Sequence, residues 1–239
     1  MPAPSIHAFA EKVALITDGE NPIGRAVALQ LALQGSYVIV GFANSSEQNK
    51  TAIAELQNLG TLANAVEADI SSPTGAKKLV AEVEKMFGRI DLLVNCLKFR
   101  NDSTFDETTE EVFERSFDTN LKAAFFVTQE SLKLMKTRPK PKIVNVVSAL
   151  DTDATAQNGL FAASQKALIG LTESLAKSLP KNFRVNAVAV SEKLSKNENL
   201  DPELFRPKTG ISEDDTARTI LFLLSSEAIG LNGQILTVE

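Results

Sequence analysis

The segment best suited to chemistry is the turn Thr17–Arg25, which separates a short apolar run from a helical pattern. It contains Gly19 and Gly24, and glycine lets backbone N–H groups approach a ligand closely. Where such a turn joins a strand to a helix, these N–H groups and the helix N-terminus together bind phosphate. The segment therefore indicates a dinucleotide site, although two glycines alone fit an ordinary strand–helix turn equally well.

Counting residues excludes several other kinds of site. Cys96 is the only cysteine, and His7, in a polar N-terminal segment, is the only histidine. An intrachain disulfide and a cysteine-rich zinc site are therefore impossible. Neither a Ser–His–Asp triad nor a multi-histidine metal site can be built, so we expect no bound metal.

Short runs rich in β-branched residues alternate with helical patterns along the chain. Most runs are continuously apolar, which is typical of a parallel sheet covered on both faces. The predicted strands are Lys12–Thr17, Tyr37–Val40, Leu62–Ala68, Ile90–Asn95, Lys142–Ser148, Phe183–Val190 and Gln234–Val238. The predicted helices are Ile23–Gln34, Glu47–Leu59, Gly75–Phe87, Thr109–Thr137, Gly159–Leu179 and Ser212–Leu224. The alternation predicts an α/β fold, with one doubly wound domain over residues 1–239.

Local residues support several of these boundaries. Ser71-Ser72-Pro73 has the form of a helix cap followed by proline in the first turn. Gly35, Gly60 and Gly88 each follow a predicted helix, as glycine commonly does.

Composition narrows the classes of partner. Among 239 residues, 25 Lys and Arg stand against 30 Asp and Glu, which gives a net charge of −5 and disfavours a general nucleic-acid surface. No apolar run approaches the ~18–20 residues that span a bilayer. The first residues, Met1–Lys12, lack the pattern of a secretory signal. We expect a cytoplasmic protein with neither nucleic acid nor membrane as a partner.

Further residues form an ordered series along the predicted elements. They are the turn Thr17–Gly24, Asp69-Ile70, Asn95, Asn120 within Asp118–Lys122, Ser148, Phe161–Leu168 and Arg184–Val188. In these landmarks, from about Lys12 to Val238, the chain resembles the classical short-chain dehydrogenase/reductase family. Within that family it is most similar to the 3-oxoacyl-acyl-carrier-protein reductases.

This resemblance implies a Rossmann-like domain with a seven-stranded parallel sheet in the order 3-2-1-4-5-6-7. It also implies an NAD(P)(H) cofactor and hydride transfer to or from a carbonyl or alcohol carbon. Homodimers or tetramers would form through the long helices Thr109–Thr137 and Gly159–Leu179. A Ser that hydrogen-bonds the substrate oxygen and an Asn that supports a water relay are matched by Ser148 and Asn120.

The chain departs from the family at the acid–base pair. The family has a Tyr and a Lys four residues apart on one helix face, and this chain has Phe161 and Gln165 there. Phe161 has no exchangeable proton and Gln165 has no charge. Loss of a positioned proton donor costs roughly 10²–10⁴ in rate. Lys166 is turned about 100° further around the helix, so we expect it on the surface rather than as a replacement.

The loops that would bind the cofactor also differ from the family pattern. Where the resemblance implies glycines, the chain has Asp18, Pro22 and Lys98, while Gly24 remains. An ionised Asp18 would repel a phosphate by about 4 kcal/mol at ~4 Å and an effective dielectric constant near 20. We hypothesise that Asp18 and Lys98 form an internal ion pair in this place. The alternative is that both side chains turn outward into water.

Some cofactor features persist. The segment Gly41–Ser45 lacks the acidic residue that would bind a ribose 2′-hydroxyl, and it is similar to the loop that holds the 2′-phosphate in NADPH-preferring relatives. Capping of the helix that begins at Glu47 is the alternative use of this segment. The cofactor-binding positions that the resemblance suggests, retained or lost, are Asp18, Gly24, Asn44, Ser45, Asp69 and Asn95. We expect weak binding of NADP(H) and no other cofactor.

Two functions remain open. The first is a short-chain dehydrogenase-like protein that is inactive or strongly impaired, and that acts as a binding or regulatory homologue, with a protein as a possible partner. The alternative is an NADP(H)-dependent carbonyl (3-oxoacyl-type) oxidoreductase with atypical acid–base chemistry. The pair Phe161 and Gln165 separates the two, because the second function requires another proton donor.

Overall fold

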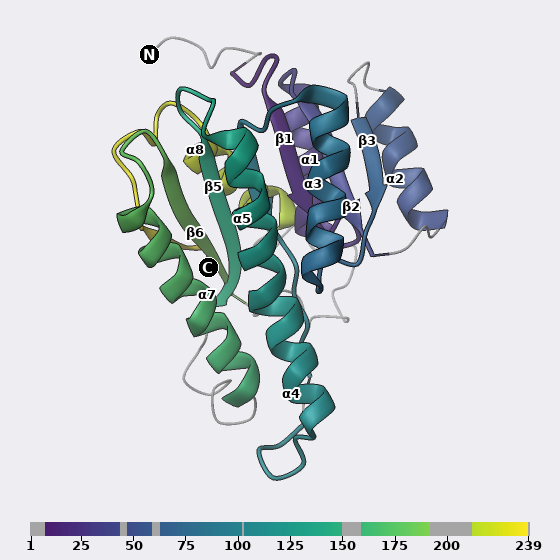
Figure 1. The fold of residues 1–239 in the computed structure, drawn as a ribbon, viewed down its shortest axis with the longest axis vertical. Helices are drawn as coiled ribbons and strands as arrows, with labels where there is room; N and C mark the ends of the chain where they lie inside the picture. The colour runs from purple at the N-terminus through teal and green to yellow at the C-terminus, as the bar shows by residue number, and fades with distance from the viewer. Residues whose placement is uncertain are drawn as a thin grey trace, which may run out of the picture.

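Seven parallel strands form one sheet at the centre of the protein (Figure 1). The computed structural model describes residues 8–43, 47–58, 63–101, 103–149, 159–191 and 212–238. The strands are β1 (Val13–Thr17), β2 (Tyr37–Phe42), β3 (Ala63–Glu67), β4 (Leu92–Asn95), β5 (Lys142–Ala149), β6 (Arg184–Ser191) and β7 (Ile235–Val238). Their order is β3-β2-β1-β4-β5-β6-β7, which confirms the predicted topology.

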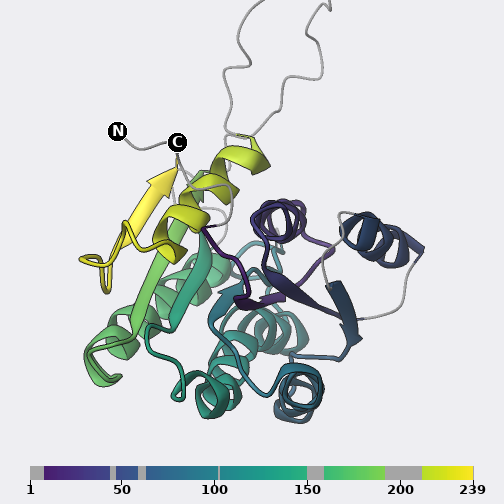
Figure 2. The same ribbon diagram turned by 90° about the horizontal axis from the view of Figure 1, so that it is seen from above.

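Helices cover both faces of this sheet. They are α1 (Pro22–Leu33), α2 (Glu47–Asn58), α3 (Pro73–Phe87), α4 (Glu110–Phe117), α5 (Ala123–Met135), α7 (Gly159–Ser178) and α8 (Glu213–Leu224). Seen from above, α1, α2 and α8 lie on one face, and α3, α5 and α7 lie on the other (Figure 2). The three-layer arrangement is the one that the alternating pattern predicts.

The central strand shows why its residues are apolar without alternation. All five residues of β1 are buried. Leu15 packs in the cluster that contains Leu79 of α3 and Met135 of α5. Its neighbour Ile16 packs in the cluster that contains Leu31 of α1, on the opposite face. Because successive side chains point to opposite faces, a strand covered on both sides must be apolar throughout.

The predicted cap at Ser72-Pro73 and the predicted glycines after α1 and α3 are confirmed. The Ser72 side chain accepts a hydrogen bond from the Gly75 N–H at 3.1 Å, and Pro73 begins α3. Gly88 ends α3 with φ +63°, and Gly35 follows α1 with φ +85°. Glycine adopts this left-handed backbone without steric cost. Gly60 lies outside the described residues.

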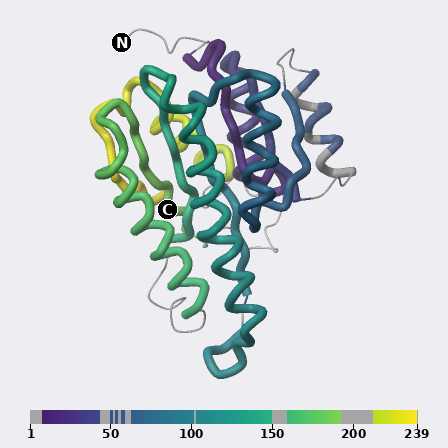
Figure 3. Tube along the Cα trace, in the orientation of Figure 1, coloured from purple at the N-terminus to yellow at the C-terminus, as the bar shows by residue number. Residues whose placement is uncertain are grey.

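The predicted helix Thr109–Thr137 contains an interruption that its periodicity did not reveal. A π-helical segment, η1 (Asp118–Lys122), stands between α4 and α5. Figure 3 shows α4 and the turn before it extending past the carboxyl ends of the strands. A π segment inserts one residue into the helical repeat. The prediction of a single regular helix was wrong in this respect.

A buried carboxylate ties the amino ends of β1 and β4 together. Asp91, only 3% exposed, accepts a hydrogen bond from the Val13 N–H at 3.0 Å. Its other oxygen lies 2.8 Å from Nε of Arg138. Arg89 and Lys12 lie 3.6 and 3.9 Å from the same carboxylate. One buried side chain therefore binds a backbone N–H and lies within ion-pair distance of three cations.

Replacement of Asp91 by Ala should lower the free energy of unfolding by about 2–3 kcal/mol, since the variant removes the acceptor of the buried Val13 N–H and of the Arg138 guanidinium. Urea denaturation monitored by circular dichroism measures the change. The control is Glu82→Ala, which removes an exposed carboxylate paired with Lys85 at 2.6 Å and should cost less than about 1 kcal/mol. Equal losses in the two variants would contradict the assignment.

No helix among the described residues is both long and apolar enough to cross a membrane.

Candidate functional site

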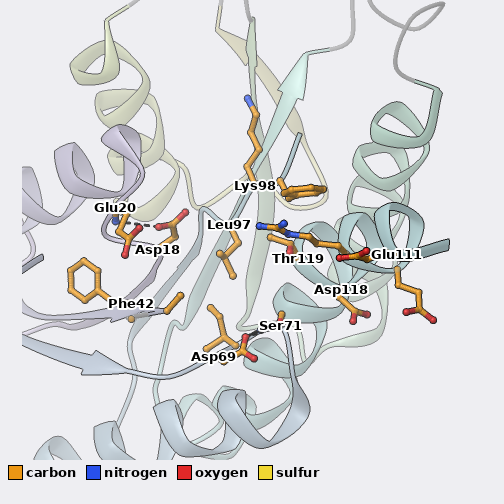
Figure 4. A pocket seen from close by; sticks show the side chains of 16 residues that line it. Asp18, Glu20, Phe42, Asp69, Ser71, Leu97, Lys98, Glu111, Asp118 and Thr119 are labelled. Atoms are coloured by element: carbon orange, nitrogen blue, oxygen red, sulfur yellow. Dashed lines mark hydrogen bonds between the residues drawn. The ribbon is translucent and has the colours of Figure 1, made fainter. Parts of the chain in front are cut away.

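Two cavities lie at the carboxyl ends of the central strands. The larger, about 590 Å³, is lined by residues that follow β1, β2, β3 and β4 and by residues of α4 and η1 (Figure 4). The smaller, about 470 Å³, is lined by the start of α1 and by residues of β5 and β6. Lys98 lines both cavities. The candidate site is therefore one region with two parts that share a lysine.

The turn after β1 requires its glycines for packing. The N–H groups of Asp18 and Gly19 donate to the Gly41 carbonyl at 3.0 and 3.2 Å, which fixes the turn against β2. A Cβ at Gly24 would lie 2.3 Å from the Asp18 carbonyl oxygen. A Cβ at Gly19 would lie 2.4 Å from Val40. Only glycine permits this close approach of α1 to the turn.

The Asp18 carboxylate turns back onto its own loop. One of its oxygens accepts hydrogen bonds from the N–H groups of Glu20 at 3.1 Å and Asn21 at 3.2 Å. The Asn21 side chain in turn accepts from the Ile23 N–H at 2.9 Å, and Pro22 has no N–H to offer. The N–H groups of Glu20, Asn21 and Ile23, at the N-terminus of α1, are thus bound by side chains of the loop itself.

Burial raises the pKa of the Asp18 carboxyl above its ordinary value, and the two loop N–H groups oppose that rise. The backbone at Asp18 has φ +65°, the left-handed region that favours glycine. Asp is one of the few other residues that tolerates it. The residue therefore combines an unfavourable backbone conformation with a partly buried charge.

The hypothesis of an Asp18–Lys98 ion pair is wrong. The Asp18 carboxylate binds the loop amides, and Figure 4 shows Lys98 extended away from it. The Lys98 ammonium lies 5.7 Å from the centroid of the Phe161 ring. The pKa of Lys98 is lowered by partial burial and by the nearby charge of Arg100. The alternative, in which both side chains turn outward into water, is also wrong for Asp18, because its carboxylate binds the backbone of its own loop.

Carboxylates outnumber cations around the larger cavity. Among the described residues that line it, the acidic ones are Asp18, Glu20, Asp69, Glu111, Glu114 and Asp118, and the basic ones are Lys98 and Arg115. The Arg115 guanidinium lies 4.3 Å from the centroid of the Phe99 ring. Excess negative charge around a cavity repels a phosphate-bearing ligand.

Asp69 lines the larger cavity and is held in place by its own turn. Its carboxylate accepts hydrogen bonds from the Ser71 N–H at 3.2 Å and the Ser71 hydroxyl at 2.5 Å. Its carbonyl accepts from the Ser72 hydroxyl at 2.9 Å. A Cβ at Gly75 would lie 1.8 Å from that carbonyl, so α3 packs directly on the turn. Asp69 is therefore a fixed part of the cavity wall.

Asn95 lies in the sheet rather than against either cavity. It is 2% exposed, and its amide nitrogen donates to Thr128 of α5 at 3.2 Å and to Asn145 of β5 at 2.8 Å. Asn145 in turn donates to Thr172 of α7 at 2.8 Å. These contacts join two strands to two helices, so the structure gives Asn95 a positioning role. Asn44 and Ser45 lie outside the described residues.

Asn120 fixes the segment that follows β4. Its amide oxygen accepts from the Phe99 N–H at 2.6 Å, and its nitrogen donates to the Phe99 carbonyl at 2.9 Å. The same nitrogen donates to the Ser164 hydroxyl at 2.8 Å, which donates to the Phe161 carbonyl at 2.7 Å. Asn120 stands in the π segment, and π segments are frequent at functional sites. One side chain thus joins η1, α7 and the segment that bears Lys98.

Ser148, Phe161 and Gln165 are brought together between β5 and α7, as the sequence predicts. The Ser148 N–H donates to the Gln165 amide oxygen at 2.9 Å, and all three residues are buried. Lys166, one position further along α7, is exposed as expected. Gln165 therefore ties the helix to the strand, and neither Phe161 nor Gln165 presents a group that exchanges protons near neutral pH.

Arg100 is a site residue that sequence reasoning missed. It lines the smaller cavity, and its guanidinium carbon lies 5.8 Å from the centroid of the Phe161 ring. Its position two residues after Lys98, on a segment that follows a central strand, was the available signal. Among the described residues, no group of three or more His, Cys, Asp or Glu side chains is arranged to hold a metal ion.

Comparisons with known proteins agree with this architecture. A family model described as short chain dehydrogenase matches residues 12–198. The short-chain dehydrogenase/reductase FrzI of Cladobotryum sp. is 28% identical over 99% of each chain. The 3-oxoacyl-[acyl-carrier-protein] reductase FabG of Staphylococcus aureus is 31% identical over 95% of this chain and 96% of its own.

Solved structures show the same likeness. A short chain dehydrogenase from Burkholderia cenocepacia, in complex with NADP, superposes with a TM-score of 0.86 at 28% identity, over 97% of this chain and 98% of its own. A single-substitution variant of actinorhodin polyketide ketoreductase, with NADPH, gives a TM-score of 0.81 at 25% identity over 95% of both chains.

Replacement of Asp18 by Gly should strengthen NADPH binding by at least about tenfold, or 1.4 kcal/mol, because it frees two N–H donors and removes a negative charge. Glycine also suits the left-handed backbone at this position. Asp18→Asn keeps an oxygen that can occupy the N–H groups but loses the charge, so it should give a smaller gain. NADPH fluorescence titration measures all three proteins.

The matched control is Glu82→Gln, which removes a negative charge from the exposed pair on α3 and should leave NADPH affinity unchanged. Equal affinity of the wild-type protein and Asp18→Gly would show that the loop carboxylate does not oppose the dinucleotide.

Proposed function

The chain belongs to the short chain dehydrogenase family, and we propose that it is a binding or regulatory member whose oxidoreductase chemistry is lost or strongly impaired. The observation that supports this most directly is the buried group formed by Ser148, Phe161 and Gln165. It stands where the resemblance implies an acid–base pair. The bond from the Ser148 N–H to the Gln165 side chain links strand and helix there, and it involves no group that titrates near neutral pH.

Reduction of a carbonyl needs a proton for the oxygen as well as a hydride for the carbon. Ser148 offers a hydroxyl that can hydrogen-bond a carbonyl oxygen, but an unassisted serine is a poor acid near neutral pH. Phe161 supplies no proton, and Gln165 supplies no positive charge that would lower the pKa of a neighbouring acid. The residues present can polarise a substrate without completing its reduction.

The residues of the larger cavity do not suit a dinucleotide diphosphate as they stand. The Asp18 carboxylate occupies the N–H groups of Glu20 and Asn21, and carboxylates dominate the lining of the cavity. The NADP and NADPH complexes of the structural relatives support the same cofactor class for this fold. We therefore propose that NADP(H) binds this chain weakly.

One observation favours the alternative, an NADP(H)-dependent carbonyl oxidoreductase with atypical acid–base chemistry. The Lys98 ammonium lies 5.7 Å from the centroid of the Phe161 ring, and its pKa is lowered. A lysine with a lowered pKa is a better proton donor than an ordinary lysine. In this alternative Lys98 would deliver the proton.

We also propose that two copies of the chain associate through the outer faces of α4 and α5. Phe113 of α4 is 51% exposed, and Phe125 of α5 is 42% exposed. Phe113 packs against Phe117 with ring centroids 4.9 Å apart and the ring planes tilted by 31°. Exposed phenylalanines on adjoining helices are typical of a surface that is buried in an assembly. A face related to itself by a two-fold axis would cover both residues.

The wild-type protein should show no NADPH oxidation above background with acetoacetyl thioesters or simple ketones, because the site lacks a positioned proton donor. Turnover near 1 s⁻¹ or faster, which is ordinary for enzymes, would overturn the proposal. The Phe161→Tyr, Gln165→Lys double variant should gain measurable turnover, most clearly when combined with Asp18→Gly. Loss of wild-type turnover in Lys98→Met would instead support the alternative.

Replacement of Phe113 and Phe125 together by Asp should convert a dimer into a monomer, since burial of two carboxylates at a symmetric interface is costly. Light scattering after size exclusion, at tens of micromolar protein, gives the mass. Phe222→Asp on α8 is the matched control, because Phe222 is exposed to a similar extent, 39%, on another helix. A monomeric wild-type protein would refute the assembly.

A further inference from the structure

The amino ends of the strands, opposite the two cavities, carry an excess of positive charge. Eight Lys and Arg stand against two acidic residues, Glu11 and Asp91, in the segments that lead into or begin four of the strands, 11–12, 89–91, 136–142 and 181–184. Glu227, before β7, is the only charged residue in the segments that lead into the other three strands. We call the surface formed by the four charged segments the basic edge.

Contacts show that the segments of the basic edge lie together. Three cations lie within 3.9 Å of the Asp91 carboxylate. The Asn182 side chain donates to the carbonyls of Arg138 at 3.2 Å and Pro139 at 3.4 Å, which joins the segment before β6 to the segment before β5. The pKa of Lys142 is lowered to about 8 by burial and by the charges of three neighbours, Lys12, Lys140 and Arg184. The cations are therefore close enough to repel one another.

The opposite end of the molecule carries the opposite charge. Residues 104–114, the turn before α4 and the first part of that helix, extend past the carboxyl ends of the strands (Figure 3). They contain no basic residue and five exposed acidic ones, Asp106, Glu107, Glu110, Glu111 and Glu114. We call this protrusion the acidic tip.

The segments outside the described residues leave both signs unchanged. Residues 1–7 and 59–62, which precede β1 and β3, contain no Asp, Glu, Lys or Arg. Beyond the other end of the strands in sequence, residues 150–158 contain two acidic residues and no basic one, and residues 192–211 contain four of each. The chain therefore has a positive and a negative end, although its net charge is −5.

Phe105 adds an apolar group to the acidic tip. It is 94% exposed, and the turn that bears it is held by its own hydrogen bonds. The Thr104 hydroxyl donates to the Glu107 carboxylate at 2.7 Å, and the Thr108 hydroxyl donates to the Thr104 carbonyl at 2.9 Å. A side chain presented on a fixed turn loses little conformational freedom when a partner covers it.

The basic edge offers apolar groups beside its cations. Pro139 and Pro180 are exposed, and Ile229 is 40% exposed. The Ile229 carbonyl accepts a hydrogen bond from Nε of Arg184 at 2.5 Å, so this side chain borders the edge. A phenylalanine that packs on such a surface gains both apolar contact and attraction between its ring and the cations.

We propose that the acidic tip of one copy of this chain docks on the basic edge of a second copy, with Phe105 against the exposed prolines. The carboxylates of the tip then face the exposed lysines of the edge, Lys136, Lys140 and Lys181. Two tips repel one another, as do two basic edges, so the copies associate head to tail. A contact between different surfaces of identical chains continues from copy to copy unless it closes into a ring.

A second copy fits the basic edge better than an unrelated acidic protein, because every copy presents both complementary surfaces, and the tip protrudes far enough to reach a neighbour. This inference goes beyond the proposed function and does not depend on it. It also differs from the symmetric contact through Phe113 and Phe125, which is apolar and therefore insensitive to salt.

Sedimentation velocity of the full chain, from about 1 to 100 μM, tests the proposal at ionic strengths of about 0.01 and 1 M, where charges are screened over about 30 and 3 Å. The weight-average mass should rise with concentration beyond that of any symmetric dimer at the low ionic strength only. Phe105→Ser should weaken this association by about tenfold, because it removes the apolar contact.

Charge reversal tests the pairing of the two surfaces. The tip variant is Asp106→Lys, Glu110→Lys, and the edge variant is Lys140→Glu, Lys181→Glu; all four positions are exposed. Neither variant should associate in this way by itself, whereas an equimolar mixture should, because each then meets a surface of opposite charge. The matched control, Lys77→Glu, Lys78→Glu on the exposed side of α3, makes the same change in net charge as the edge variant and should associate like the wild-type protein.

Three results would overturn the head-to-tail contact. They are a wild-type mass that does not depend on salt, association of either reversed variant by itself, and no association in their mixture. A polyglutamate peptide that binds the wild-type protein but not the edge variant, in the absence of self-association, would assign the basic edge to another acidic protein instead. The NADPH oxidation assay is independent of all these results, so failure of this contact and failure of the proposed function are distinguished.

Discussion

Parallel pairing of all seven strands places every strand's carboxyl end at one edge of the sheet, and both cavities depend on this arrangement. Helices that cover both faces hold the strands in register, and buried polar links reinforce them. Asn95 and Asn145 connect β4 and β5 to α5 and α7 through Thr128 and Thr172. The loops at this edge can therefore vary in sequence while the sheet that supports them stays unchanged.

Electrostatics divides the site into two halves of opposite character. The larger half is surrounded mainly by carboxylates, and the carboxylate of Asp18 is bonded to the N–H groups at the start of α1. The smaller half has two cations beside a buried aromatic ring. The two halves therefore differ in the charge that their described residues present to a ligand.

The side chains of Phe161 and Gln165 are buried and contribute to the packing around β5 and α7. Gln165 accepts a hydrogen bond from the Ser148 N–H, which a charged lysine could not do. Phe161 supplies a ring face for Lys98 and Arg100, and its carbonyl accepts the Ser164 hydroxyl in a series of bonds that includes Asn120. Each of these two side chains is therefore buried and in contact with neighbouring elements. These contacts hold α7 against β5 at this point of the sheet.

The sequence by itself determined the class of fold, the strand order through family resemblance, and most helix boundaries. Short continuous apolar runs rich in β-branched residues, such as β1, are typical of strands buried on both faces, and caps such as Ser72-Pro73 act locally. The grouping of Ser148 with Phe161 and Gln165 followed from the family resemblance, while their spacing of four places positions 161 and 165 on one helix face.

Only the tertiary structure decided where the charged side chains of the loops point. Asp18 bonds to amides two and three residues away rather than to Lys98, and Lys98 joins Arg100 at the Phe161 ring. The π segment at Asn120 likewise left no mark on the hydrophobic period. Strands and helices leave a pattern in the sequence because their buried positions must be apolar, and these positions recur at a regular spacing. The direction of a loop side chain follows from competing partners that are distant in sequence, and these meet only when the sheet has formed.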